Sequence, residues 1–161
     1  MLSPRSCSAN PVIDLDIMHA HPIQESPIET ELLAFAAGDH VMWELEQYAT
    51  TKDITAGRIA PGIGAFSEAV LAFFNTETNE YEEIHVDEPT EVVSLSGNIA
   101  LFEGVPRLHV HAMLSKRDGS CVGGHLVSGV VNPTLEVFVT KFDEVVHRYV
   151  DERTGLPLLE G

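Results

Sequence analysis

The sequence lacks most of the features that mark membrane, secreted or nucleic-acid-binding proteins. No apolar run is long enough to span a bilayer, and the first residues contain no apolar stretch of signal-peptide length. Lysine and arginine number only 9, against 25 aspartates and glutamates, so the net charge is −16. A surface this acidic repels phosphate backbones and anionic membranes. We therefore expect a cytoplasmic protein that binds small molecules, metals or protein partners.

Cysteine is scarce as well. Cys7 and Cys121 form no Cys-x-x-Cys pair, and Cys7 falls in a segment that we expect to be a tail. Neither a disulfide framework nor a cysteine-ligated metal is indicated. The 161 residues, 44% of them hydrophobic, suit one domain with a proper core.

The chain divides into an N-terminal arm and a single folded domain. Residues 1–27 contain four prolines and no sustained hydrophobic period, which predicts a flexible arm. Residues 28–161 form the predicted domain. It begins with TELLAFAAGD, which predicts a strand that ends at Gly38. Asp39 is a suitable N-cap for a helix over HVMWELEQYAT.

After this helix the chain predicts mainly strands. ITAGRIAPGIGAF is glycine-rich and tight, and TEVVSLSGNIALFEG suits one strand or two. The other predicted strands are EAVLAFFN, YEEIHVD, RLHVHAMLS, CVGGHLVSGVV and TLEVFVTKF, with turn signals at NTETNE, KRDG and NP. The final segment, VVHRYVDERTGLPLLEG, fits either a short helix or an extended edge. One helix and many strands predict an α+β domain on a largely antiparallel sheet, with Trp43 and the other aromatics in its core.

Three histidines crowd into the twenty residues from Arg107 to Leu126. Successive side chains of a strand point to opposite faces. One face of the first predicted strand carries Leu108, Val110, Ala112 and Leu114, and the other carries Arg107, His109, His111 and Met113. The two imidazoles thus leave the core together, about 7 Å apart along the strand. KRDG then predicts a turn that brings His125 back to them, behind Gly123 and Gly124, which permit a close approach to the backbone.

Three neutral imidazoles with an open fourth position are a usual ligand set for zinc, and they also suit nickel, cobalt or ferrous iron. The open position would hold water or a ligand. A His-x-His pair alone more often marks an ordinary polar face, so the hypothesis depends on His125 joining the pair from the returning strand. We predict a divalent metal site at His109, His111 and His125.

Other polar side chains are candidates for roles beside such a metal. The strand from Thr134 to Val139 also alternates and places Glu136 off the core face, where it could ligate the metal, orient a histidine or act as a base. Arg58 and Arg107 are candidate partners for a ligand carboxylate. Whether the protein is an enzyme stays open at this point.

Several motifs resemble one known family in their order and spacing. GIGAFSEAVLAFFN, EVVSLSGNIAL, HVHAML, GGHLVSGVV and TLEVFV resemble the PPC domain (plants and prokaryotes conserved, DUF296), from about Glu29 to the TGLPLL ending. The resemblance implies an antiparallel sheet with a helix, assembled as a homotrimer. It also implies that the three histidines bind metal near subunit interfaces. Acetolactate decarboxylase, a zinc enzyme, looks like a remote structural relative, but such kinship transfers no activity.

Plant members of this family join the domain to an AT-hook and bind DNA, and this chain departs from them. It has no Arg-Gly-Arg-Pro sequence, and Glu88-Pro89-Thr90-Glu91 stands where plant proteins carry a Gly-Arg-Phe-Glu partner-contact stretch. Direct DNA binding is therefore not expected. Two functions remain: a metal-centred site that binds or acts on a small molecule, or a trimeric DNA-associated or regulatory interaction module with a structural metal.

Overall fold

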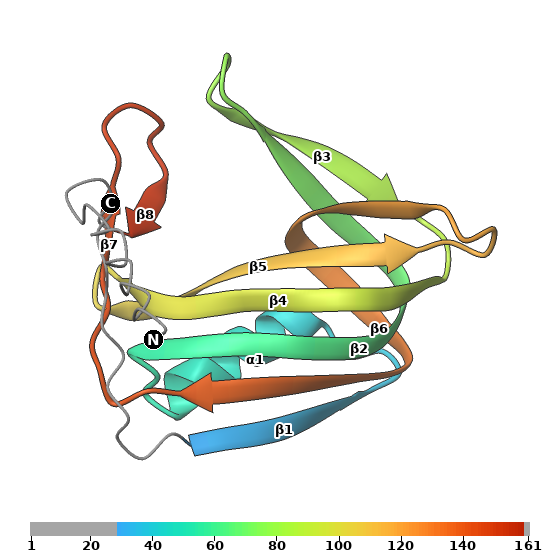
Figure 1. Ribbon diagram of the computed structural model, residues 1–161, viewed down its shortest axis with the longest axis horizontal. Helices are drawn as coiled ribbons and strands as arrows, with labels where there is room; N and C mark the ends of the chain where they lie inside the picture. Colours follow the sequence, from blue (N-terminus) through green and yellow to red (C-terminus); the bar gives the residue numbers. More distant parts are fainter. Residues whose placement is uncertain (1–28, 160–161) are drawn as a thin grey trace, which may run out of the picture.

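A computed structural model describes residues 29–159, so the predicted arm over residues 1–27 lies outside the described part of the chain. The elements, in chain order, are β1 (Glu29–Ala36), α1 (Val41–Thr51), β2 (Ala56–Asn75), β3 (Glu80–Val86), β4 (Thr90–Phe102), β5 (Val105–Ser115), β6 (Cys121–Lys141), β7 (Arg148–Val150) and β8 (Pro157–Leu159) (Figure 1). The strands of the main sheet pair antiparallel, which confirms the predicted α+β class. Between residues 29 and 159, no helix is long and apolar enough to cross a membrane.

Four strands close into a ring. β2 pairs with β4 and with β6, β4 pairs with β5, and β5 pairs with β6. β1 extends the C-terminal half of β6, and β3 extends the C-terminal half of β2 into a hairpin that projects from the ring (Figure 1). The register of β2 shifts around Gly62 and Gly64, and such bulges bend a strand. The long strand β2 can therefore bend and pair with both β4 and β6 as the ring closes.

The core lies inside this ring and under the helix. β5 buries Leu108, Val110, Ala112 and Leu114, as its alternating pattern predicts. α1 contributes Val41, Leu45 and Ala49, which are four residues apart on one helical face. The opposite face of β5, which carries His109 and His111, is thereby left outside the core.

The structure corrects several local predictions. The N-cap of α1 is His40, with no side-chain cap, because Asp39 Oδ2 instead accepts a hydrogen bond from the Ala36 amide at 2.8 Å. The segment ITAGRIAPGIGAF is not a separate tight segment, since most of it is the first half of β2. Asn132-Pro133 is not a turn, since both residues lie within β6. The prediction that the aromatics lie in the core holds for Phe35 and Phe66. It is wrong for five others that are 39% to 63% exposed, namely Trp43, Phe73, Tyr81, Phe138 and Tyr149.

The C-terminal segment takes the extended alternative. β7 and β8 form a small antiparallel hairpin. It is held to the ring by a bridge between Leu101 and His147 and by a hydrogen bond from the Leu101 amide to the Val146 carbonyl, 2.8 Å long. This attachment places Arg148, the first residue of β7, beside β4.

Candidate metal centre

The predicted hairpin brings the three histidines together. His111 on β5 lies directly opposite His125 on β6, and His109 lies two residues before His111 on the same face. Paired residues of neighbouring strands share a face, so all three imidazoles leave the sheet on one side. The ring centroids are 5.1, 5.4 and 5.6 Å apart, which describes a nearly equilateral triangle.

The spacing of the ring nitrogens fits one shared metal ion. His109 Nε2 and His111 Nε2 are 3.2 Å apart, and each histidine offers one nitrogen within 4.8 Å of the others. Two nitrogens that bind one tetrahedral zinc at about 2.0–2.1 Å are separated by about 3.4 Å. His125 Nδ1 is buried without a hydrogen-bond partner in the described part of the chain. Because an orphaned buried nitrogen is costly, a bound cation near it would stabilise the site.

For two of the three histidines, the surroundings lower the pKa and so favour the neutral form that binds metal. Burial, with the nearby Arg148 and the other two imidazoles, lowers the pKa of His109 to about 4. Burial and His111 also lower the pKa of His125. A neutral imidazole is the form that ligates a metal, so these two side chains need not lose a proton near neutral pH.

The histidines face a cavity of about 780 Å³ between two hairpins. The β2–β3 hairpin bounds one side and the β7–β8 hairpin the other, with β5 and β6 between them (Figure 1). Asn79 Nδ2, in the turn after β2, donates a hydrogen bond to the Arg153 carbonyl oxygen in the turn after β7, at 3.1 Å. This contact joins the two hairpins near their tips. A volume of this order suits a small ligand.

The lining of the cavity is apolar and basic. Its apolar part is contributed by Ala72, Phe73, Phe74, Leu108, Leu156, Pro157 and Leu158. Tyr81 packs edge-on against Phe74 at 5.1 Å and lies 5.4 Å from the His125 ring. Arg107 and Arg148 are the two cationic side chains of the lining. Of the residues that line the cavity in the described chain, none is an aspartate or a glutamate.

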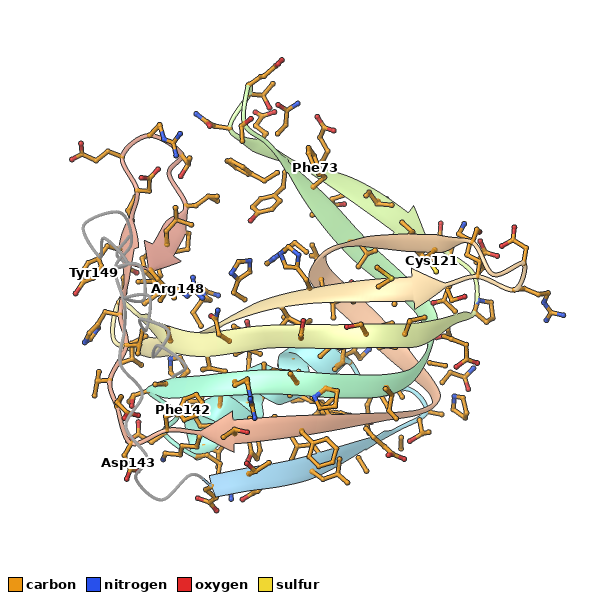
Figure 2. The ribbon with its side chains drawn as sticks, viewed as in Figure 1. Phe73, Cys121, Phe142, Asp143, Arg148 and Tyr149 are labelled. Atoms are coloured by element: carbon orange, nitrogen blue, oxygen red, sulfur yellow. The ribbon has the colours of Figure 1, made fainter. Side chains whose placement is uncertain are left out.

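Arg148 is the member of this site that sequence reasoning missed. Arg148 is only 6% exposed. Its guanidinium donates hydrogen bonds to the Pro157 carbonyl oxygen at 3.1 Å and to Asn98 Oδ1. Asn98 lies directly opposite His109 in the β4–β5 register, which positions Arg148 next to the histidines. Figure 2 shows Arg148 on the side of β7 that faces β5, with Tyr149 on the other side.

Of the other three candidate residues, one lines the cavity and two do not. Arg107 lines the cavity, but its side chain is about half exposed and lies 3.9 Å from Glu46. Arg58 is exposed on β2 and does not line it. Glu136 is exposed on β6 opposite Ala34 and Ile63, and it also lies outside the lining. The roles suggested for Glu136, Arg58 and Arg107 stay predictions.

Glycines let the strands approach each other closely at the site. A Cβ at Gly97 would lie 2.2 Å from the His109 carbonyl oxygen, and one at Gly124 would lie 2.8 Å from the Ala72 carbonyl oxygen. A Cβ at Gly123 would meet its nearest atom at 3.2 Å, which is less severe. Any side chain at Gly97 or Gly124 would therefore push neighbouring strands apart and move the histidines. The groups that approach the glycine pair are the backbones of adjacent strands.

The ring of β2, β4, β5 and β6 is a closed antiparallel barrel. The three histidines lie together on one outer face of it, and such a fold can present a metal centre. The sequence model of the Plants and Prokaryotes Conserved (PCC) domain family, also written PPC, matches residues 24–143. The chain therefore belongs to this family. The match spans the ring strands and the histidine hairpin, which confirms the resemblance found in the sequence.

Solved structures with the same fold support this assignment. A metal-containing protein from Archaeoglobus fulgidus is 34% identical, with a TM-score of 0.81 over 89% of this chain and 100% of that one. A PPC protein from Pyrococcus horikoshii is 28% identical, with a TM-score of 0.81 over 89% and 98% of the two chains. A protein from Bacteroides thetaiotaomicron, described as a candidate DNA-binding protein, is 27% identical, with a TM-score of 0.79 over 86% and 96%.

One curated protein shares part of its length with this chain. The bifunctional protein GlmU of a Synechococcus strain is 26% identical over 129 residues, which is 80% of this chain. The chain spans only 19% of that relative's length, so the likeness concerns one segment of a much longer protein.

Proposed function

We propose that this protein is a metal-binding PPC-domain protein whose three histidines hold one divalent ion, zinc or a similar metal, and leave a position open for a small molecule. The observation that carries the proposal is the triangle of imidazoles in the lining of a cavity of about 780 Å³. A purely structural metal is usually closed off by a fourth protein ligand. Here no cysteine, aspartate or glutamate of the described chain joins the three histidines.

The metal and the chain's own residues have separable roles in this proposal. A bound divalent ion supplies Lewis acidity and an exchangeable coordination position. His109 and His111 on β5 and His125 on β6 would hold the ion at the cavity. Phe74 and Tyr81 on one side, and the β7–β8 hairpin on the other, would exclude water from a ligand. The metal content of the relative from Archaeoglobus fulgidus supports the proposal.

The exchangeable position can be tested with cobalt. Metal-free protein loaded with one equivalent of Co²⁺ is expected to show the visible absorption of a four- or five-coordinate nitrogen-ligated site, because cobalt accepts the ligand sets of zinc. Azide, a small ligand for open positions, should shift this spectrum in a saturable way. A cobalt spectrum that azide leaves unchanged would indicate a closed, structural site, and no cobalt binding at all would contradict the proposed metal centre.

The second candidate is a DNA-associated or regulatory module, which the description of the Bacteroides thetaiotaomicron relative favours. Direct DNA contact is opposed by the charge, because a homotrimer, the assembly that we propose, would carry three times −16, or −48. A regulatory function of this chain would therefore act through a protein partner, with the metal as a structural element.

We predict no binding to duplex DNA at physiological salt. Non-specific affinity arises from cations that neutralise phosphates, and this chain has an excess of 16 negative charges instead. Fluorescence anisotropy of a labelled duplex should stay flat up to high micromolar protein, both at low and at physiological salt. A basic DNA-binding domain titrated in parallel controls for the assay. Tight binding that weakens steeply as salt rises would contradict the prediction.

A further inference from the structure

The cavity next to the histidines has a charge opposite to that of the protein around it. The chain carries 25 acidic residues, yet none of those described lines the cavity, whereas two arginines do. A divalent ion would add two further positive charges. In a protein of net charge −16, such a local surplus of positive charge selects for a negative ligand, because field lines concentrate within a cleft with apolar walls.

Arg148 is the less compensated of these two arginines. It is 6% exposed, and within residues 29–159 no carboxylate forms an ion pair with it. Its two hydrogen bonds, to Pro157 and Asn98, use two of the five guanidinium N–H groups, and its Nε is buried without a partner in the described chain. A buried cation without a counter-charge is costly. A ligand anion would supply that counter-charge.

Arg107 is less suited to this role. Its side chain is about half exposed and already has Glu46 at 3.9 Å as a partial counter-charge. Arg148, by contrast, is fixed by Asn98, whose strand position is directly opposite His109. Fixation next to a proposed metal ligand, without a counter-ion, is the arrangement expected of a group that pairs with an anionic ligand at the open position of the metal.

We infer that Arg148 is the anchor for a small carboxylate with an apolar body, and that this class of molecule is the ligand of the proposed metal centre. The inference rests on the proposed function and deepens it. The carboxylate pairs with the guanidinium, and the apolar body lies against Phe74, Tyr81 and Leu158. Arg148 also joins the β7–β8 hairpin to β4, so the binding role must be separated from this structural one.

The wild-type protein provides the first test. Full-length protein loaded with Co²⁺ is titrated with isovalerate and with isovaleramide, which have the same shape but differ in charge. Isovalerate is expected to change the visible spectrum at concentrations at least about tenfold lower than isovaleramide, as a charge-assisted hydrogen bond requires. Equal affinity for the two compounds, or no response to isovalerate in protein that binds cobalt, would overturn the inference.

Variants then assign the effect to Arg148. Arg148→Gln should weaken isovalerate binding roughly 10- to 100-fold. The same variant should bind Co²⁺ more tightly in anion-free buffer, because a nearby positive charge has been removed. Arg148→Lys should retain part of the isovalerate affinity. Arg153→Gln, which removes an equal charge from the same hairpin outside the cavity, should change neither affinity.

The pattern of results separates four outcomes that contradict the inference. If Arg148 only latches the hairpin, Arg148→Gln weakens cobalt and isovalerate binding together, and the inference fails. If Arg107→Gln costs more isovalerate affinity than Arg148→Gln, the anchor is Arg107 and the inference fails. If the wild-type protein binds no cobalt, the proposed function itself fails. A cobalt site that responds to azide, but whose isovalerate affinity Arg148→Gln does not change, overturns only the role of Arg148.

Discussion

Replacing His109, His111 and His125 together by alanine is expected to abolish stoichiometric metal binding. Each histidine supplies one nitrogen to a set that lies within 4.8 Å, and alanine offers no ligand atom. Loss of groups that only orient a ligand costs about 10- to 100-fold in metal affinity, so each single ligand substitution should cost at least about 100-fold. Elemental analysis of untagged protein and calorimetric zinc titration of the metal-free form measure the effect.

His85→Ala is the matched control. His85 is an exposed histidine on β3 whose side chain lies 3.2 Å from Glu83 and does not line the cavity. Its removal takes away one imidazole without touching the triangle, so metal content should be unchanged. Circular dichroism of all variants establishes that they are folded. A folded triple variant that keeps one equivalent of metal would show that the ion is bound elsewhere.

The triangle of histidines was predictable from the sequence because it depends on local rules. Strict alternation over β5 separates Leu108 and Val110 from His109 and His111, and the KRDG turn sets a hairpin whose register pairs His111 with His125. Both rules act over about twenty residues of sequence. The one helix and the antiparallel strands are predictable on the same basis.

Two features were not predictable because long-range pairing determines them. Glycine and proline in the first half of β2 signal a break, yet this segment is flanked by β4 and β6, whose ladders hold it extended through bulges at Gly62 and Gly64. Arg148 lies at the site because Leu101 forms a bridge to its neighbour His147, and because Asn98 accepts a hydrogen bond from the Arg148 guanidinium. Both contacts join residues about fifty positions apart in the sequence. No local pattern in VVHRYVDERTGLPLL indicates either partner.

Assembly is the second property for which we expect a large effect. The exposed side chains Leu32, Ile63 and Phe138 lie on neighbouring strands β1, β2 and β6, where Leu32 is paired with Phe138 and Ile63 with Glu136. Their exposed fractions are 52%, 56% and 39%. Because an apolar stripe across three strands is a usual mark of a protein interface, we propose that this face is covered by other subunits of a homotrimer.

Phe138→Glu is therefore expected to convert a trimer into monomers at low salt. The substitution places a charge in the apolar stripe, in subunits that already bring −16 each to the assembly. For the wild-type protein, association should strengthen as salt rises, since salt screens repulsion beyond about 8 Å at physiological ionic strength. Light scattering coupled to size exclusion, at low and high salt, gives the mass directly.

Two further proteins make this prediction sharper. Val145→Glu introduces the same charge at a residue that is 57% exposed outside the stripe, and it should leave the trimer intact. A chain without residues 1–25 should also remain a trimer, because all three stripe residues lie within β1, β2 and β6. A wild-type monomer at every salt concentration would refute the trimer. A trimer that survives Phe138→Glu but is lost on truncation would place the interface in the N-terminal segment instead, because only residues 1–25 would then be required to hold the subunits together.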